Sequence, residues 1–163
     1  MSLSKIFTDS DSLCPHIEEC KRRGLKIVFA NGCFELLHVG HIRYLREAKS
    51  LGDILIVAVN TDESMSVVKP DRSPVNPDSE RFEIIAALEA VDYVVPLREQ
   101  TPITLIELFK PDIHTKGTDY TLDDIPERSA VESYGGRVQL VGGPKVRNTR
   151  DMLDELRGGP YKK

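Results

Sequence analysis

The sequence predicts an α/β protein: a Rossmann-like, doubly wound parallel sheet in a single domain. Short apolar runs without polar alternation recur along the chain, as expected for strands buried on both faces of a parallel sheet. Segments with helical spacing and clear start and stop signals separate these runs. The 163 residues suffice for one domain of ordinary size with a real core.

The first half of the chain predicts two helices and two strands. N-cap candidates at residues 9–12 begin a helix that should end before Gly24. The apolar run 26–30 predicts the first strand, a helix is expected over 38–51, and a second strand over 54–59. Strand, helix and strand within about thirty-five residues indicate a right-handed parallel crossover.

A loop and a third helix should follow. Residues 69–78 contain three prolines among polar residues, which predicts a loop long enough to reach over a site. Asn76 and Pro77 are expected to be the cap and first residue of a helix that ends near Ala90. The remaining elements are a strand at 92–97, a helix at 101–109, a short strand around Ile113, a strand at 137–141 and a final helix.

The expected organisation is an N-terminal helix region at 1–25, a main domain at 26–157 and a loose, flexible tail at 158–163. No internal repeat, low-complexity tract or interdomain linker interrupts the alternation of elements. One compact unit is therefore predicted.

Composition excludes several classes of protein. No apolar run approaches the ~18 residues that cross a bilayer, so no membrane partner is expected. The N-terminus lacks the features of a secretory signal, which predicts a cytoplasmic protein. A net charge of −4 argues against nucleic acid as a partner. The three cysteines form no CxxC pair, so neither a disulfide framework nor a zinc site is indicated.

The segment 30–41, Ala-Asn-Gly-Cys-Phe-Glu-Leu-Leu-His-Val-Gly-His, lies where the first strand gives way to the next helix. His38 and His41 are three residues apart and should share a face beside the free N–H groups of the first turn. Gly40 would let a phosphate approach the backbone closely. A lone histidine is more often a helix cap or a surface residue, but the whole arrangement indicates an anion site.

This segment resembles the cytidylyltransferase-like nucleotidyltransferases, most closely their heptose 1-phosphate adenylyltransferase branch. The similarity runs through GCFELLHVGHIRYLREAKSLGDILIVAVNTDES, VVKPDRSPVNPDSERFEIIAALEAVDYVV and KPDIHTKGTDY, and persists more weakly to the final helix. It therefore covers most of the chain.

The resemblance implies roles for four catalytic residues. The histidines of the HxGH motif, His38 and His41, bind the triphosphate and stabilise charge as the α-phosphorus is attacked. Lys69 matches a lysine in the mobile loop that reaches the phosphates, and Arg81 an arginine at the start of the following helix. Taken alone, Lys69 would be a solvated loop charge, and Arg81 would be a surface cation with even odds.

The resemblance also implies a binding site. The nucleotide-binding residues are Asn31, Gly32, Cys33, Phe34, Gly40, Lys116, Gly117, Asn148 and Thr149. Asp119 and Tyr120 are assigned to the acceptor or base pocket, where a carboxylate can accept a hydrogen bond and a ring can stack. Mg²⁺ is the expected cofactor, bound with the nucleoside triphosphate, and no protein residue is assigned as its ligand.

Two departures from the family pattern concern the site. Glu35 stands where the family usually has Asp, which lengthens a carboxylate near the histidines by one methylene. The Ser/Thr-rich start of the family's last helix appears here as Val-Arg-Asn-Thr-Arg at 146–150. Asn148 and Thr149 can still cap a helix and bind a phosphate, while Arg147 can point either into the site or to solvent.

The predicted activity is transfer of a nucleoside monophosphate, with ATP as the leading donor, to a sugar 1-phosphate such as heptose 1-phosphate, releasing pyrophosphate. One alternative is a cytidylyltransferase acting on a polyol or amino-alcohol phosphate. Another is a noncatalytic nucleotide-binding module. The expected partners are the triphosphate and the phosphorylated acceptor, and relatives suggest a homodimer.

Overall fold

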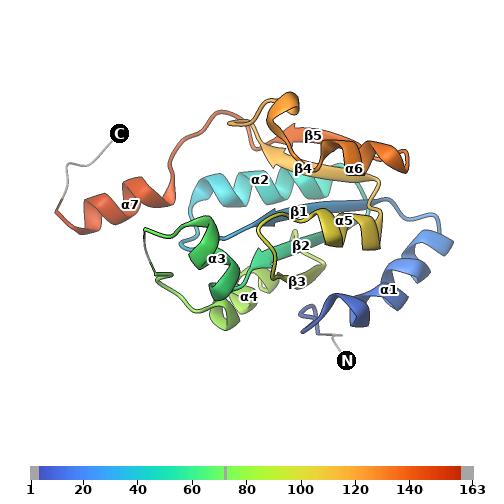
Figure 1. Cartoon of the computed structure of the whole chain (residues 1–163), viewed down its shortest axis with the longest axis horizontal. Helices are drawn as coiled ribbons and strands as arrows, with labels where there is room; N and C mark the ends of the chain where they lie inside the picture. Colours follow the sequence, from blue (N-terminus) through green and yellow to red (C-terminus); the bar gives the residue numbers. More distant parts are fainter. Residues whose placement is uncertain (1–3, 72, 159–163) are drawn as a thin grey trace.

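The computed structural model describes residues 4–71 and 73–158 and contains one sheet of five parallel strands with helices on both faces (Figure 1). The strand order is β3-β2-β1-β4-β5. The predicted fold class, an α/β Rossmann-like single domain, is confirmed. The strands are β1 (Ile27–Gly32), β2 (Ile54–Asn60), β3 (Tyr93–Leu97), β4 (Ile113–Gly117) and β5 (Arg137–Val141).

Most of the helices occur where the sequence predicts them. The short helices α3 and α6 and the 3₁₀ turn η1 are additional elements that the sequence patterns did not reveal. The helical elements are α1 (Ser10–Arg22), α2 (Val39–Ser50), α3 (Asp62–Val68), α4 (Asp78–Ala86), α5 (Ile103–Phe109), η1 (Leu122–Asp124), α6 (Arg128–Ser133) and α7 (Thr149–Leu156).

The start and end of α4 differ from prediction. Pro77 occupies the N-cap position and supplies no side-chain cap, whereas the Asn76 amide donates to the Glu35 carbonyl at 3.4 Å. The helix ends at Ala86 rather than near Ala90. Beyond Ala86, the Val91 N–H donates to the Leu88 carbonyl, which closes a turn instead of continuing the helix.

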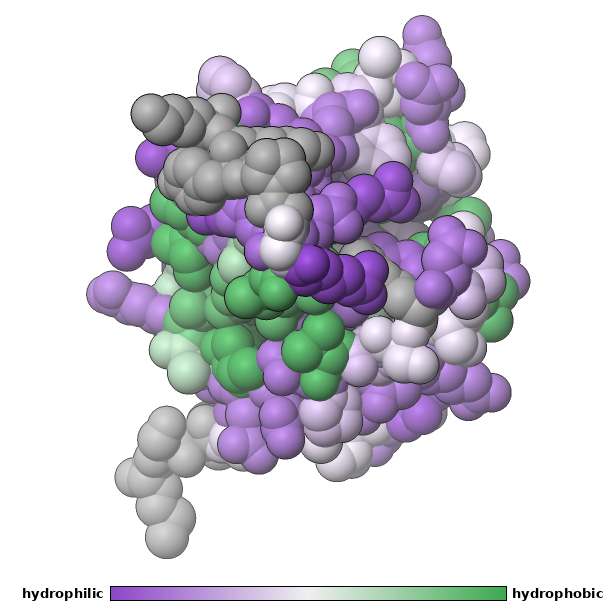
Figure 2. Space-filling model, turned by 90° about the vertical axis from the view of Figure 1, so that its left-hand side faces the viewer, coloured by the Kyte–Doolittle hydropathy of each residue, from purple (hydrophilic) through white to green (hydrophobic). Residues whose placement is uncertain are grey.

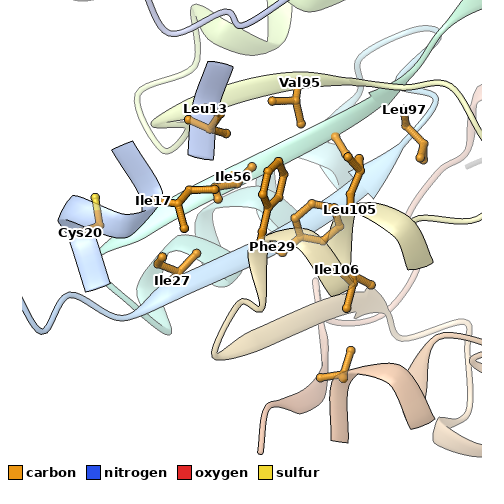
Figure 3. Close-up of a cluster of buried hydrophobic side chains, with 13 residues drawn as sticks. Leu13, Ile17, Cys20, Ile27, Phe29, Ile56, Val95, Leu97, Leu105 and Ile106 are labelled. Carbon is orange, nitrogen blue, oxygen red and sulfur yellow. The ribbon is translucent and has the colours of Figure 1, made fainter. Parts of the chain in front are cut away.

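Alternate residues of the central strand face two separate cores. Ile27 and Phe29 point to the side covered by α1 and α5, where Figure 3 shows them packed with Leu13 and Ile17 of α1. Val28 and Ala30 point to the opposite side, where α2 and α4 pack. Because β1 is apolar on both faces, it must lie inside the sheet with helices on either side.

The connections leave the sheet in opposite directions on the two sides of β1. From β1 the chain passes through α2 to β2 and then to β3, whereas β4 and β5 lie on the other side. Such a reversal leaves a crevice beyond the carboxyl ends of β1 and β4, which is where ligands bind in open α/β sheets.

The segment that precedes α1 extends the sheet along the outer edge of β3. The Val94 N–H donates to the Lys5 carbonyl at 2.8 Å, and the Phe7 N–H donates to the Val94 carbonyl at 2.9 Å. Ile6 and Val94 thus form an isolated parallel bridge. The ammonium of Lys5 also donates to the carbonyl of Val91 at 2.7 Å.

Viewed from the side of α3 and α7, the surface has a cluster of apolar residues among polar ones (Figure 2). Exposed apolar side chains at this end include Val67 and Val68 on α3 and Val75 in the loop before α4. None of the described helices combines the length and apolarity that crossing a bilayer requires. Apart from Gly158, the predicted tail at 158–163 lies outside the described residues.

Candidate active site

A cleft of about 810 Å³ lies at the carboxyl ends of β1 and β4. It is lined by every residue that the sequence assigns to nucleotide or acceptor binding, and by three of the four residues assigned to catalysis. Arg81 is the exception. Segments separated by more than a hundred residues therefore meet at one site, as the crevice of a doubly wound sheet predicts.

His38 is the N-cap of α2. Its Nδ1 accepts a hydrogen bond from the Gly40 N–H at 3.1 Å, and its ring stacks on that of His41 with centroids 3.9 Å apart. Burial lowers the pKa of His38, and the charges of Arg147 and Lys145 lower it further. A neutral ring whose Nδ1 accepts must carry its hydrogen on Nε2, so His38 offers one N–H donor.

His41 is the more deeply buried of the two. Burial lowers its pKa to about 4, with added contributions from His38 and Lys69 and an opposing one from the Leu36 backbone. The ring of Phe34 packs edge-on against it, with centroids 5.2 Å apart. At neutral pH the stacked pair is therefore uncharged, and it can donate hydrogen bonds without the repulsion of two cations.

Gly40 is required by the cap geometry. A Cβ atom placed on it would lie 2.9 Å from the His38 ring, a distance that real Cβ atoms essentially never show. Phe34 has a left-handed backbone with φ of 48°, which turns its ring back over Gly32. A left-handed backbone conformation is sterically unfavourable for a bulky residue such as phenylalanine. Backbone strain of this kind is common at functional sites.

Lys69 is the C-cap of α3, so it lies at the end of a helix rather than within a free loop. Its backbone N–H donates to the Met65 carbonyl at 2.7 Å. Its side chain lines the cleft, and its charge lowers the pKa of His41. The lysine is thus close enough to the histidine pair to share a polyanionic ligand with it.

Arg81 is 1% exposed and lies behind the cleft. Its Nη1 donates to the carbonyls of Cys33 and Asn60, each at 2.7 Å, and its Nη2 to Asp62 at 2.8 Å. These bonds tie the ends of β1 and β2 to the start of α3. Through these hydrogen bonds Arg81 stabilises the start of the loop that precedes the histidines. A direct role of Arg81 in catalysis stays a prediction.

The end of β4 forms one wall of the cleft. Lys116 donates to the Asn31 side chain at 3.3 Å, and its ammonium lies 5.3 Å from the centroid of the Tyr120 ring. A Cβ atom on Gly117 would lie 2.6 Å from an oxygen of Asp119, because that carboxylate folds back over the glycine. The predicted binding residues of this segment thus contact one another and the end of β1.

The start of α7 forms the opposite wall. Asn148 is its N-cap and accepts from the Asp151 N–H at 2.8 Å, while the Thr149 hydroxyl donates to the Leu36 carbonyl at 3.5 Å. Arg147 lines the cleft and pairs with Glu155 of α7. The guanidinium of Arg147 thus contacts a side chain of α7, and its charge also acts on His38.

The cleft is lined by five basic and four acidic side chains, although the whole chain has a net charge of −4. Five basic residues line it: Lys69, Lys116, Lys145, Arg147 and Arg150. Asp119 pairs with Lys145 at 3.3 Å at the mouth of the cleft. With the N-termini of α2 and α7 at the same place, this distribution favours a small polyanion over an extended one.

The structure also adds residues that sequence reasoning missed. Tyr44 lines the cleft and its hydroxyl donates to the Thr115 carbonyl at 2.9 Å. Glu127, 1% exposed, also lines it and binds Lys116. Nothing in the sequence marks either residue, because Tyr44 lies on an amphipathic helix and Glu127 in a polar loop. Glu35 is buried beside the histidines at 2% exposure.

A family model described as cytidylyltransferase-like matches residues 29–153. The chain is 48% identical over 146 residues to the bifunctional protein HldE of Geobacter metallireducens, and 41% identical over 147 residues to HldE of Ectopseudomonas mendocina. These alignments cover 90% of this chain but only 30% and 31% of the relatives. The chain thus spans about a third of the length of the curated relatives that it matches.

Among solved structures, a lipopolysaccharide core biosynthesis protein from Thermoplasma volcanium is 33% identical with a TM-score of 0.63. That match covers 76% of this chain and all of the other. Pantoate-beta-alanine ligase from Francisella tularensis also has a TM-score of 0.63, at 16% identity, over 91% of this chain and 70% of the other. The second likeness shows the shared fold alone.

Proposed function

Because this chain belongs to the cytidylyltransferase-like family, we propose that it is a nucleotidyltransferase that uses the cleft described above. One observation supports the proposal most directly: two stacked, neutral histidines at the start of α2 face a cleft lined by five basic side chains. Fixed donors of this kind stabilise charge that develops during a reaction.

In the proposed reaction, an oxygen of the acceptor phosphate attacks the α-phosphorus of the triphosphate. A new P–O bond forms, the bond from the α-phosphorus to the bridging oxygen breaks, and pyrophosphate leaves with the electron pair. The acceptor phosphate is already ionised near neutral pH, so no general base is required. Positioning and charge neutralisation supply most of the catalysis.

Each part of the cleft has a distinct task in this proposal. The Nε2–H of His38 and the ring of His41 donate to the triphosphate, and the N-terminus of α2 attracts the same charge. Lys69 neutralises the departing pyrophosphate from the end of α3. Asn148 and Thr149 hold phosphate oxygens at the start of α7, beside Arg147.

A divalent ion, most simply Mg²⁺, would offset the negative charge of the triphosphate when bound. Within residues 4–71 and 73–158, no group of three or more His, Cys, Asp or Glu side chains is placed to hold a metal ion. Mg²⁺ commonly binds together with substrate phosphates and water, so in this proposal it enters with the triphosphate and no protein residue is assigned as its ligand.

We propose ATP as the donor and a sugar 1-phosphate such as heptose 1-phosphate as the acceptor. The resemblance of the HxGH and KGTDY segments to heptose 1-phosphate adenylyltransferases supports this choice. The similarity to the lipopolysaccharide core biosynthesis protein from Thermoplasma volcanium supports the same choice.

The proposal is tested by incubating the protein with each of the four ribonucleoside triphosphates and a panel of phosphorylated sugars and polyols. Pyrophosphate release that needs both ATP and a sugar 1-phosphate is expected. Release that needs CTP and a polyol or amino-alcohol phosphate would instead identify a cytidylyltransferase. Nucleotide binding without release under any pair would identify a noncatalytic module. Sedimentation of the same sample tests for the expected homodimer.

A further inference from the structure

A cluster of three polar side chains, two of them buried, lies at the β4 wall of the cleft. His114 is completely buried and Glu127 is 1% exposed. A single oxygen of Glu127, Oε1, lies 2.9 Å from the His114 Nε2 and 2.7 Å from the Lys116 ammonium. Polar groups as deeply buried as these are stable only when they are paired, so the cluster acts as one unit.

The charges of the cluster follow from its surroundings. Burial on its own would raise the pKa of Glu127, but the His114 hydrogen bond and the Lys116 charge outweigh it and lower the pKa to about 2. Glu127 is therefore ionised and can only accept hydrogen bonds. His114, whose pKa is lowered by burial, thus donates its Nε2–H to the carboxylate.

Lys116 is held on three sides. Its ammonium pairs with the Glu127 carboxylate and donates to the Asn31 side chain at 3.3 Å. The same ammonium lies 5.3 Å from the centroid of the Tyr120 ring. Its side chain is 13% exposed, and it lines the cleft next to the end of β1. A free lysine would sample many rotamers, so these contacts fix the ammonium in one place before any ligand arrives.

We propose that Glu127 is a positioning residue: it fixes the Lys116 ammonium in the nucleotide site, and His114 in turn anchors Glu127. Glu127 acts on the nucleotide through Lys116. This inference rests on the proposed function for the identity of the ligand. A purely structural role, in which the ion pair only stabilises the start of α6, predicts a different result.

The two roles are separated by a double-variant cycle with Glu127→Gln and Lys116→Met. Glutamine keeps the shape and the acceptor oxygen of Glu127 but removes its charge, and methionine keeps the length of Lys116. Binding of ATP with Mg²⁺ is measured by calorimetry for the wild type, both single variants and the double variant. Glu132→Gln on α6, where Glu132 pairs at the surface with Arg128, is the matched control.

If Glu127 positions Lys116, Glu127→Gln weakens ATP binding about 10-fold or more, as expected for a hydrogen bond to a charged group. Lys116→Met weakens it at least as much, and the double variant binds ATP no more weakly than Lys116→Met alone. The double variant also unfolds at a higher temperature than Lys116→Met, because it no longer buries an uncompensated carboxylate. The Glu132→Gln control binds ATP like the wild type.

Unchanged ATP affinity in folded Glu127→Gln would overturn the proposal, and so would independent losses that multiply in the double variant. If Glu127→Gln does not fold, Glu127→Asp retains the charge on a shorter side chain. That variant should then bind ATP more weakly than the wild type while keeping its melting temperature within a few degrees.

Failure of the positioning role can be told apart from failure of the proposed function. Pyrophosphate release is measured on the same wild-type sample. If the wild type binds ATP but releases no pyrophosphate with any acceptor, the proposed function fails, while the affinity cycle still decides the role of Glu127. If the wild type binds none of the four triphosphates, both proposals are wrong.

Discussion

At the scale of single residues, the stacked histidines are the most direct test of the site. Replacing His38 or His41 with alanine removes one preoriented donor and should lower turnover by about 10²–10³. Each ring lies at the cleft rather than in either apolar core, so folding should be little affected. Steady-state kinetics at saturating substrates, with circular dichroism as a check of folding, measures both effects.

The matched control for these variants is His16→Ala. His16 lies on α1 outside the cleft lining, and its ring contacts Phe7 and Tyr93. It should keep wild-type turnover. Near wild-type turnover in folded His38→Ala or His41→Ala would mean that the pair has no catalytic role.

The buried His41 predicts how stability depends on pH. Its pKa is about 4 in the folded protein and about 6.5 in the unfolded chain. Between these two pKa values the unfolded chain binds more protons at His41 than the folded protein does. The contribution of neutral His41 to the stability of the folded protein is therefore fully present above about pH 6.5 and is lost as the pH falls towards 4. The melting temperature of the wild type should therefore fall between about pH 7.5 and about pH 5.

The variant His41→Gln isolates this effect, because glutamine does not titrate. Its melting temperature should fall less over the same interval, while His114, whose pKa is also lowered, contributes to both proteins alike. Thermal unfolding followed by circular dichroism makes the comparison. An equal fall in both proteins would show that His41 is not protonated on unfolding.

Sequence reasoning found residues that occur in a motif and missed those defined only by burial. His38, Gly40 and His41 share a short segment with a physical rationale, so they could be predicted together. Glu127 occurs in an acidic stretch, 119–127, that would normally face solvent. Only the fold shows that it points inward to Lys116. Arg81 was predicted to be a catalytic residue, but it is buried outside the cleft lining, where its guanidinium donates to backbone carbonyls at strand ends.

At the scale of elements, α3 and the loop after it predict a response to ligand. Lys69 is the C-cap of α3, and the described residues that follow it, 70–71 and 73–77, form neither helix nor strand. If Lys69 binds the triphosphate, the backbone amides of α3, Lys69 and Asp71 should exchange hydrogen more slowly when ATP and Mg²⁺ are present. Mass spectrometry of peptides covering 61–71 measures this.

Helix α5 provides the internal reference for that experiment. It packs in the core on the α1 face of the sheet and should exchange at the same rate with and without nucleotide. Slower exchange in both helices would indicate a general tightening of the protein. An unchanged rate of hydrogen exchange around Lys69 under saturating nucleotide would contradict binding of the triphosphate by this segment.

The length of an element decided how well it could be predicted. The segment of α2 has four apolar or small residues at a spacing of three and a glycine stop, and its prediction is confirmed within one residue at each end. The seven residues of α3 bury only Ser64 and Met65, which is too little periodicity to recognise. Asn76 was expected to cap α4, but its amide bonds the Glu35 carbonyl, a tertiary contact that local sequence does not encode.

At the scale of the whole molecule, the fold class could be predicted because strands buried on both faces of a sheet are continuously apolar in sequence. The strands β1 and β2 are almost wholly apolar, and only a parallel sheet covered on both sides accommodates two such neighbours. The same logic placed the site, since the carboxyl ends of β1 and β4 meet where the connections reverse. Strand order itself needed the structure, because several orders satisfy the same pattern.

The N-terminal segment that lies along β3 has a consequence for solubility. A strand at the rim of a sheet exposes unpaired N–H and C=O groups, which can join the strands of other molecules into aggregates. The Lys5 carbonyl and the Phe7 N–H form hydrogen bonds with the backbone N–H and carbonyl of Val94. The backbone of Val94 is therefore not available to pair with a strand of another molecule. A chain that begins at Asp9 should scatter more light than the full chain at equal concentration and accumulate as β-rich particles. If its scattering stays at the level of the full chain, β3 needs no such shield.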